Sequence, residues 1–258
     1  MNSFKDWKIL GKPLFIGEGA HWKVYRAFLE KEESINEYKF SQFIYKINKN
    51  KSEFEVKQNI TVYNYIKNTG LPTLKFYFSE VLNGIDVIIA DDLNANDLLF
   101  VSPNNERNNS DDDKLLKTIQ GIEVHEFDEN AEKLLLNNKL FHIDNFKYFI
   151  DKIYNDMEEL SRHNIGSCED QFFFGTYKNK KKSEIFYKIA DFDTLIIGSH
   201  LKKVEKLELK NIKIMLNALF EYITIFIDDS TKEYYQEKLL KEIKDIEKKL
   251  SVKQKYVV

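Results

Sequence analysis

Residues 185–198 read IFYKIADFDTLIIG, an apolar run that ends in Asp191, a phenylalanine and a second aspartate. Aromatic and β-branched side chains dominate the run, which favours a strand up to Ala190. A carboxylate presented at the end of such a strand can hold a Mg²⁺ ion that bridges phosphates. The stretch is therefore a candidate metal-binding element, and the rest of the chain bears on that interpretation.

The chain before this strand predicts a long helix, a loop and a hairpin. Apolar side chains recur at helical spacing and predict a helix with one buried stripe: Phe146, Phe149, Ile150, Ile153, Met157 and Leu160. A loop then begins at His163, and Asp170 precedes the apolar run QFFF. The hairpin spans 171–190, with its turn in the lysine-rich KNKKK.

A second candidate lies near the start, where residues 15–27 read FIGEGAHWKVYRA. Gly17 and Gly19 stand one residue apart, and a backbone without Cβ atoms can approach phosphates closely. A plain β-turn between two strands explains the same pattern. A Walker loop is excluded because no Gly-Lys-Ser/Thr follows, and a Rossmann turn because the chain continues as strand after the glycines.

Lys46 lies in FSQFIYKIN (residues 40–48), another predicted strand. A lysine among apolar neighbours is costly to bury unless an anion neutralises it, as nucleotide phosphates would. The alternative is a surface lysine that lays its stem on the protein and keeps its charge in water.

The order of elements favours a small β-rich part followed by a larger α-rich part. Within the first part, 13–29 and 40–48 predict strands, 52–68 a helix, and 73–93 a hairpin turning at Asn83-Gly84. Residues 102–113 are a polar loop, and the chain from 114 onward is largely helical apart from the hairpin. Two apolar stripes predict further helices: Ile212, Met215, Leu216, Leu219 and Ile223, then Leu239, Leu240, Ile243, Ile246 and Leu250.

Composition narrows the possible partners. With a net charge of −3 over 258 residues, the chain has no general basic field, so neither nucleic acid nor a membrane surface is an expected partner. No run approaches the roughly 18 apolar residues of a membrane span. The one cysteine, Cys168, excludes an intramolecular disulfide and suits a reducing compartment. We therefore expect a cytoplasmic protein, or one inside a host cell if it is a secreted effector.

Taken in order, these stretches resemble the protein kinase superfamily. That family has a loop G-x-G-x-x-G-x-V, a strand with V-A-I-K, a catalytic loop H-R-D and the sequence D-F-G. The loop is matched by Gly17, Gly19 and Val24, with Trp22 in place of the third glycine. FIYKI matches the lysine strand, and Asp-Phe-Asp replaces Asp-Phe-Gly. The resemblance covers residues 15 to 193.

The resemblance implies an α+β, two-lobed kinase-like fold. Residues 1–92 would form a small five-stranded lobe, and residues 93–258 a helical lobe. The hinge segment 90–94 (ADDLN) would offer backbone groups to an adenine.

The resemblance also implies site roles for an ATP and Mg²⁺ cofactor pair. Gly17, Gly19 and Val24 would cover the nucleotide. Lys46 would pair with its phosphates and act in catalysis together with Asp191. Asp170, at the position of the metal-binding asparagine, would hold Mg²⁺ with Asp191.

Three departures from the family bear on activity. The position of the catalytic aspartate is Ile165, which cannot accept a proton. Glu55 is the predicted helix partner of Lys46, although spacing also permits Gln58, Asn59 or Ile60. The segment after Asp193 is short and resembles minimal bacterial effector kinases and aminoglycoside-type phosphotransferases.

Two hypotheses follow from the resemblance and its departures. One is an ATP-binding phosphotransferase of atypical, weak activity toward an unidentified protein or small-molecule acceptor. The other is a pseudokinase that acts as a nucleotide-regulated binding module.

Overall fold

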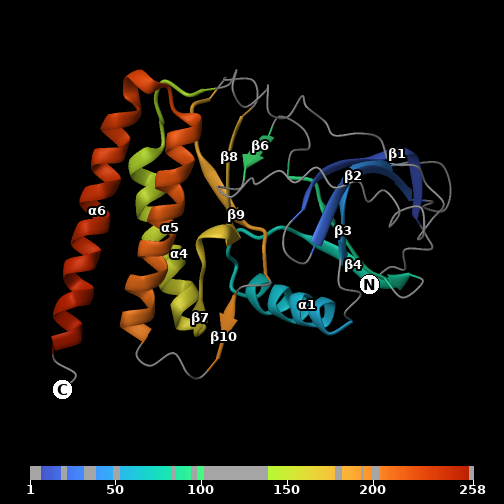
Figure 1. Ribbon diagram of the computed structural model, residues 1–258, viewed down its shortest axis with the longest axis horizontal. Coiled ribbons are helices and arrows are strands. Elements are labelled where there is room, and N and C mark those ends of the chain that lie inside the picture. Colours follow the sequence, from blue (N-terminus) through green and yellow to red (C-terminus); the bar gives the residue numbers. More distant parts are fainter. Residues whose placement is uncertain are drawn as a thin grey trace. The chain divides into compact units, whose positions relative to one another are not determined.

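The structure is a computed structural model with a mixed α+β fold (Figure 1). It describes residues 7–18, 22–31, 39–48, 53–82, 85–93, 98–101, 139–177, 182–192, 195–198 and 204–255. The chain divides into two compact units. The sheet unit comprises Met1–Thr61, Leu74–Asn96 and Asn105–Ala131, and the helical unit comprises Val62–Thr73, Asp97–Asn104 and Glu132–Val258.

The sheet unit contains a five-stranded antiparallel sheet in the order β1-β2-β3-β5-β4. Its strands are β1 (Trp7–Glu18), β2 (Trp22–Lys31), β3 (Lys39–Asn48), β4 (Phe76–Leu82) and β5 (Ile85–Asp91). The strands predicted at 13–29 and 40–48 and the hairpin at 73–93 are therefore confirmed. β3 pairs with both β2 and β5, so Lys46 lies on an interior strand of the sheet.

Helix α1 (Glu53–Lys67) confirms the helix predicted over 52–68. It ends before Gly70, whose φ of +78° suits a residue without a Cβ atom. Within α1, Asn59 is buried, whereas Ile60 is only half-buried. The buried side chains of α1 are Val56, Asn59, Val62, Tyr63 and Ile66.

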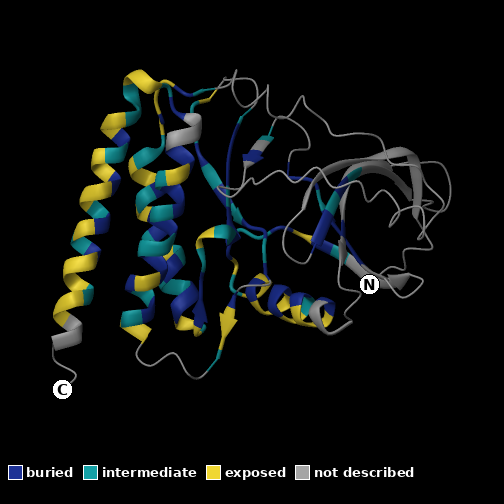
Figure 2. Ribbon diagram, in the orientation of Figure 1, coloured by how far each residue is buried: buried dark blue, intermediate teal, exposed yellow. Residues whose placement is uncertain are grey.

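The described part of the helical unit holds three long helices, α4 (Phe146–Arg162), α5 (Val204–Phe226) and α6 (Asp229–Lys255). Helix α5 packs against both α4 and α6, and their facing sides are buried (Figure 2). The stripe predicted for 212–223 is confirmed, because all five of its side chains are at most 1% exposed. In the α4 stripe, Phe146 and Ile150 are half-buried and the other four members are buried.

In helix α6, one side chain of the predicted apolar stripe is exposed rather than buried. Leu239, Ile243 and Ile246 are buried, but Leu240 is 39% exposed. Leu240 lies about 100° around the helix from Leu239 at 3.6 residues per turn, which moves it off the narrow seam that faces α5.

Two small antiparallel sheets complete the described helical unit. One has the order β6-β8-β9, and the other pairs β7 with β10. Their strands are β6 (Leu98–Val101), β7 (Ile165–Gly166), β8 (Phe172–Tyr177), β9 (Phe186–Ile189) and β10 (Ile196–Ile197). β8 and β9 are the predicted hairpin. Gly175 is required where β8 meets two rings, because a Cβ there would lie 2.7 Å from Phe186 and 2.8 Å from Phe100.

Several predicted features lie outside the described residues. They are Gly19, the turn at Asn83-Gly84, most of the KNKKK turn, the loop 102–113, Asp193 and the end of the hinge segment. The side chain of Glu55 is also outside the described set. Among the described residues, no helix is both long and apolar enough to cross a membrane.

Candidate functional site

The two predicted metal ligands flank the same end of the β8–β9 hairpin, because Asp170 precedes β8 and Asp191 follows β9. Its register pairs Phe172 with Ile189, and one step further Ala190 N donates to Gln171 O at 3.0 Å. The next step along both chains reaches Asp170, in the 3₁₀ turn η2 (Glu169–Gln171), and Asp191. Both side chains are half-buried. Carboxylate oxygens are among the ligands that Mg²⁺ prefers in proteins.

The phenylalanine after Asp191 anchors this end of the hairpin. Phe192 is fully buried and meets the Tyr63 ring edge-on, with 5.6 Å between ring centroids. Tyr63 lies in the second half of α1, which belongs to the helical unit. The contact therefore fixes the chain just after the carboxylate against a helix.

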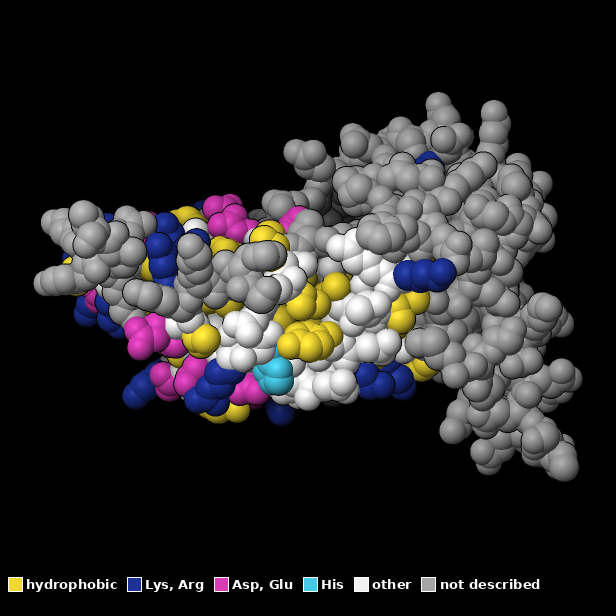
Figure 3. Space-filling model, turned by 90° about the horizontal axis from the view of Figure 1, so that it is seen from below, with side chains coloured by type: hydrophobic (Ala, Val, Ile, Leu, Met, Phe, Trp, Pro, Cys, Tyr) yellow, Lys and Arg dark blue, Asp and Glu magenta, His cyan; other side chains and the backbone are white. Residues whose placement is uncertain are grey.

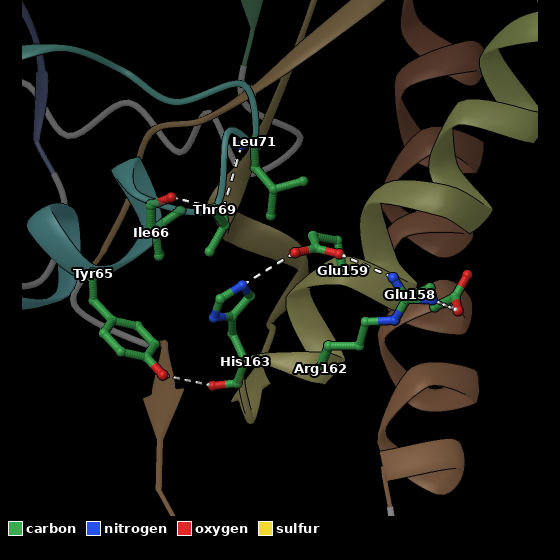
Figure 4. A network of polar contacts seen from close by, with 8 residues as sticks. All are labelled: Tyr65, Ile66, Thr69, Leu71, Glu158, Glu159, Arg162 and His163. Atoms are coloured by element: carbon green, nitrogen blue, oxygen red, sulfur yellow. Dashed lines mark hydrogen bonds and ion pairs between the residues drawn. The ribbon is translucent and has the colours of Figure 1, made fainter.

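Where α4 ends and the loop at His163 begins, α4 contacts the end of α1 (Figure 4). His163 Nε2 lies 3.1 Å from Glu159 Oε1, and Tyr65 donates its hydroxyl to the His163 carbonyl at 3.1 Å. Arg162 pairs with Glu158 and Glu159. These side chains are substantially exposed, so the ion pairs contribute little stability. The His163 carbonyl therefore joins the end of α4 to α1, while the His163 ring pairs with Glu159 of α4.

Ile165 is fully buried on β7 and pairs with Ile197 of β10. It follows Asn164, whose φ of 56° is in the left-handed region that asparagine tolerates. At the position where the resemblance would place a catalytic aspartate, the chain therefore has a core hydrocarbon.

Asn211, which the sequence reasoning missed, holds this loop from α5. The side chain is fully buried, and its Oδ1 accepts from Ser167 N at 2.9 Å and Ser167 Oγ at 3.0 Å. Its Nδ2 lies 2.8 Å from Ile165 O and 2.9 Å from Ser161 Oγ. The available signal was a lone asparagine next to Ile212 in an apolar stripe. All of its hydrogen-bonding capacity is used to position the start of the 165–170 loop.

In the sheet unit, Lys46 is 6% exposed, which excludes the alternative of a solvated surface lysine. Its ammonium lies 5.2 Å from the centroid of the Trp22 ring, a cation–π distance. The register places Lys46 opposite Val24, which is half-buried. Lys23 is equally buried, but it lies on the opposite face because side chains alternate along a strand.

The hinge segment carries two bonded aspartates that the sequence reasoning left without a role. Arg26 of β2 donates from Nε to Asp92 Oδ2. Tyr77 of β4 donates its hydroxyl to Asp91, whose backbone N–H donates to Lys75 O at 2.9 Å. A charged residue in the apolar pattern of β2 was the signal for the first of these pairs.

Asn59 bears on the predicted helix partner of Lys46. It is 1% exposed, and its Oδ1 has no hydrogen-bond donor among the described residues. Gln58 is exposed and Ile60 half-buried. Among the three alternatives to Glu55, Asn59 is thus the polar side chain that faces the interior. Its Oδ1 can accept a hydrogen bond from a donor such as an ammonium group or a metal-bound water.

Within the described residues, no cluster of three or more His, Cys, Asp or Glu side chains forms a metal cage. Mg²⁺ is commonly held by one or two carboxylates together with substrate phosphates and water. The Asp170–Asp191 arrangement fits that chemistry, with the phosphates supplying the remaining oxygen ligands.

Some exposed apolar side chains of the described part lie near the end of α1 and on β10. Tyr65, Ile196 and Ile197 are between 39% and 56% exposed, and Figure 3 shows apolar side chains interspersed with charged ones on the face that it presents. No family model matches the chain, and no curated protein matches its sequence significantly.

Proposed function

We propose that the protein is an ATP-binding, kinase-like phosphotransferase of atypical activity. The observation that carries the proposal is that Asp170 and Asp191 flank the same end of the β8–β9 hairpin, next to the bond from Ala190 N to Gln171 O. Two carboxylates in that arrangement would hold Mg²⁺ against the phosphates of a nucleotide. In the order expected of kinases, Asp170 follows a loop that begins at His163, and Asp191 opens the Asp-Phe-Asp sequence at the end of a later strand.

The sheet unit supports the same proposal. In protein kinases the lysine that pairs with the phosphates lies on the third strand, and a helix follows it. Here Lys46 is buried on β3, and α1 follows. Gly17 belongs to β1, and Val24 lies on β2 opposite Lys46. Gly17 and Gly19 would cover the phosphates in this proposal, and Lys46 would neutralise them.

The chain's own residues then account for part of the chemistry. Phosphoryl transfer depends largely on positioning and on neutralising developing charge. Lys46 would offer the cation, while Asn211 and Phe192 would keep the segments of Asp170 and Asp191 in place. With a hydrocarbon at Ile165, proton removal from the acceptor would fall to Asp170 or Asp193 in part, or to solvent. Slow transfer is the expected result.

A pseudokinase that binds nucleotide without transfer is the second candidate. The complete burial of Ile165 favours it, because no carboxylate takes that position. In this case the nucleotide would regulate the binding of a partner.

Thermal unfolding with Mg²⁺ and ATP tests the shared part of both candidates. Wild-type protein should be stabilised, since a ligand at about 100 times its Kd adds roughly 2.7 kcal/mol. Lys46→Ala and Asp191→Ala should lose this stabilisation. Lys23→Ala is a matched control, because Lys23 is as buried as Lys46 on the other face of the same sheet. Equal stabilisation of wild type and both site variants would refute the site.

Incubation with γ-labelled ATP separates the two candidates. Label on the protein or on a co-purified acceptor, lost in Asp191→Ala, identifies an enzyme. Binding without transfer of phosphate, AMP or another nucleotide moiety, with Mg²⁺ and with Mn²⁺, identifies the pseudokinase.

A further inference from the structure

The ammonium of Lys46 is in contact with an aromatic ring. It lies 5.2 Å from the centroid of the Trp22 ring, and the two residues are 6% and 3% exposed. The electron-rich face of a tryptophan attracts a cation, and the attraction is strongest where water is excluded. With both residues buried, a phosphate reaches the ammonium only after a local rearrangement, and the ring is the group that it meets there.

The strand register explains why these two side chains meet. Trp22 opens β2 and lies opposite Asn48, the last residue of β3. Lys46 lies two residues before Asn48, opposite Val24. Because residues two positions apart share a face of the sheet, Trp22 and Lys46 are diagonal neighbours on one face. Aromatic and long side chains at diagonal positions are within reach of each other, so the contact lies entirely within the sheet unit.

The place of Trp22 in the sequence bears on what the contact does. It stands where the resemblance has the third glycine of the loop that covers the phosphates. A glycine at that position has no side chain and lets the backbone approach phosphates closely. An indole ring at the same position takes up space and attracts the cation that the phosphates need. The departure from the family pattern and the observed contact therefore concern the same residue.

We propose that the contact between Trp22 and Lys46 is autoinhibitory: the ring holds the ammonium and must leave it before phosphates bind. This inference rests on the proposed function, in which Lys46 neutralises the phosphates of a nucleotide. Phosphate oxygens offer the ammonium charge-assisted hydrogen bonds, which a ring cannot supply. Binding therefore exchanges one partner of Lys46 for another. The observed affinity for ATP is lowered by the strength of the contact that is lost.

The first test measures the affinity for ATP with Mg²⁺ by calorimetry. Trp22→Leu removes the ring but keeps an apolar side chain, and it should bind ATP about tenfold to thirtyfold more tightly than the wild type. That range is the factor by which a cation–π contact shielded from water shifts an equilibrium. Trp22→Phe keeps a ring that attracts cations less strongly, and its affinity should fall between the two.

Tyr25→Leu is the matched control for a general loosening of the sheet. Tyr25 is an aromatic residue of the same strand and is 2% exposed, but it lies on the other face because side chains alternate. It should bind ATP as the wild type does, with each variant compared at a temperature where its unfolding curve shows it to be folded. Equal or weaker binding of ATP by Trp22→Leu overturns the inference.

The second test follows the ring itself. The chain has two tryptophans, Trp7 and Trp22, so a Trp7→Phe protein reports on Trp22 alone. ATP with Mg²⁺ should shift its emission to longer wavelength and increase its quenching by acrylamide, because a ring released from the lysine is more exposed to water. Inorganic tripolyphosphate should do the same, since it carries the phosphates without the nucleoside. Lys46→Ala in the same background should show neither change.

The outcomes separate this inference from the proposed function. ATP binding that leaves the emission and quenching of Trp22 unchanged removes the autoinhibitory role and leaves the proposed function standing. If neither the wild type nor Trp22→Leu binds ATP, the proposed function fails together with the inference.

Discussion

At the scale of single residues, Asn211 shows how one side chain controls the geometry of a loop. It bonds to Ser167 N, Ser167 Oγ, Ile165 O and Ser161 Oγ from the middle of α5. Two of these partners are backbone groups of buried residues, which have no access to water if the asparagine is lost. The loop therefore depends on a residue that lies about 40 positions further along the chain.

We expect Asn211→Leu to destabilise the protein by about 2–4 kcal/mol, because it leaves a buried N–H and a buried C=O without partners. Urea unfolding measures the loss. Asn217→Ala is the control on the same helix, since its bond to Glu169 at 3.2 Å is exposed, and it should change stability by less than about 0.5 kcal/mol. Similar losses for the two variants would contradict the assigned role of Asn211.

At the scale of elements, α6 separates buried from exposed leucines at consecutive positions. Leu239 is fully buried, and Leu240 is 39% exposed. The composition of the helix does not distinguish them, because both are leucines flanked by lysines. They differ because Leu239 lies on the side of α6 that packs against α5, and Leu240 does not.

Leu239→Ala should therefore cost about 2–5 kcal/mol through lost burial and a cavity. Leu240→Ala should change the free energy of unfolding by no more than about 0.5 kcal/mol. Denaturant midpoints of the two variants, measured side by side, check this, and a large effect of Leu240→Ala would place the seam elsewhere on the helix.

At the scale of the whole molecule, buried tyrosines couple stability to alkaline pH. Burial raises the pKa of Tyr222, and burial followed by the charge and hydrogen bond of Asp156 raises the pKa of Tyr187. In the unfolded chain a tyrosine ionises near pH 10. The two hydroxyls are therefore neutral in both states below about pH 10, and above it ionisation favours the unfolded chain.

Stability should accordingly be unaffected by these groups up to about pH 10 and then fall by up to roughly 1.4 kcal/mol per pH unit for each tyrosine. Urea midpoints at pH 8 and pH 11 measure the loss. Tyr222→Phe should reduce it, while Tyr148→Phe, at a site that is 69% exposed, should not. An identical alkaline loss in the Tyr222→Phe protein would rule out its contribution.

Prediction from the sequence succeeded where the structure depends on neighbours a few residues away. The spacing of Ile212, Met215 and Ile223 identified the buried face of α5 because a helix repeats every 3.6 residues. The same reasoning placed Leu240 in the buried stripe of α6, which was wrong because Leu240 is 39% exposed. Periodicity gives the approximate direction of a face, but its edges depend on the elements packed against it.

The residues of the candidate site also fall into those that the sequence identified and those that only the structure revealed. The identities of Lys46, Asp170 and Asp191 as candidate ligands came from motifs, and their roles remain predictions. The motifs did not indicate that Arg26 would pair with Asp92, or that Asn59 rather than Ile60 would be buried in α1. These facts depend on strand pairing and helix rotation, which no local pattern specifies.

By itself, the sequence determined which segments become strands and helices and which chemical groups the chain carries. Only the tertiary structure decided which groups meet: Phe172 pairs with Ile189 in the β8–β9 register, Arg26 meets Asp92 across 66 residues, and Asn211 reaches Ser167 across 44. The physical reason is one of range. Backbone geometry repeats over two to four residues and leaves its mark in local spacing. Contacts between distant segments are selected by the burial of apolar surface over whole elements, together with the hydrogen bonds that those elements must satisfy.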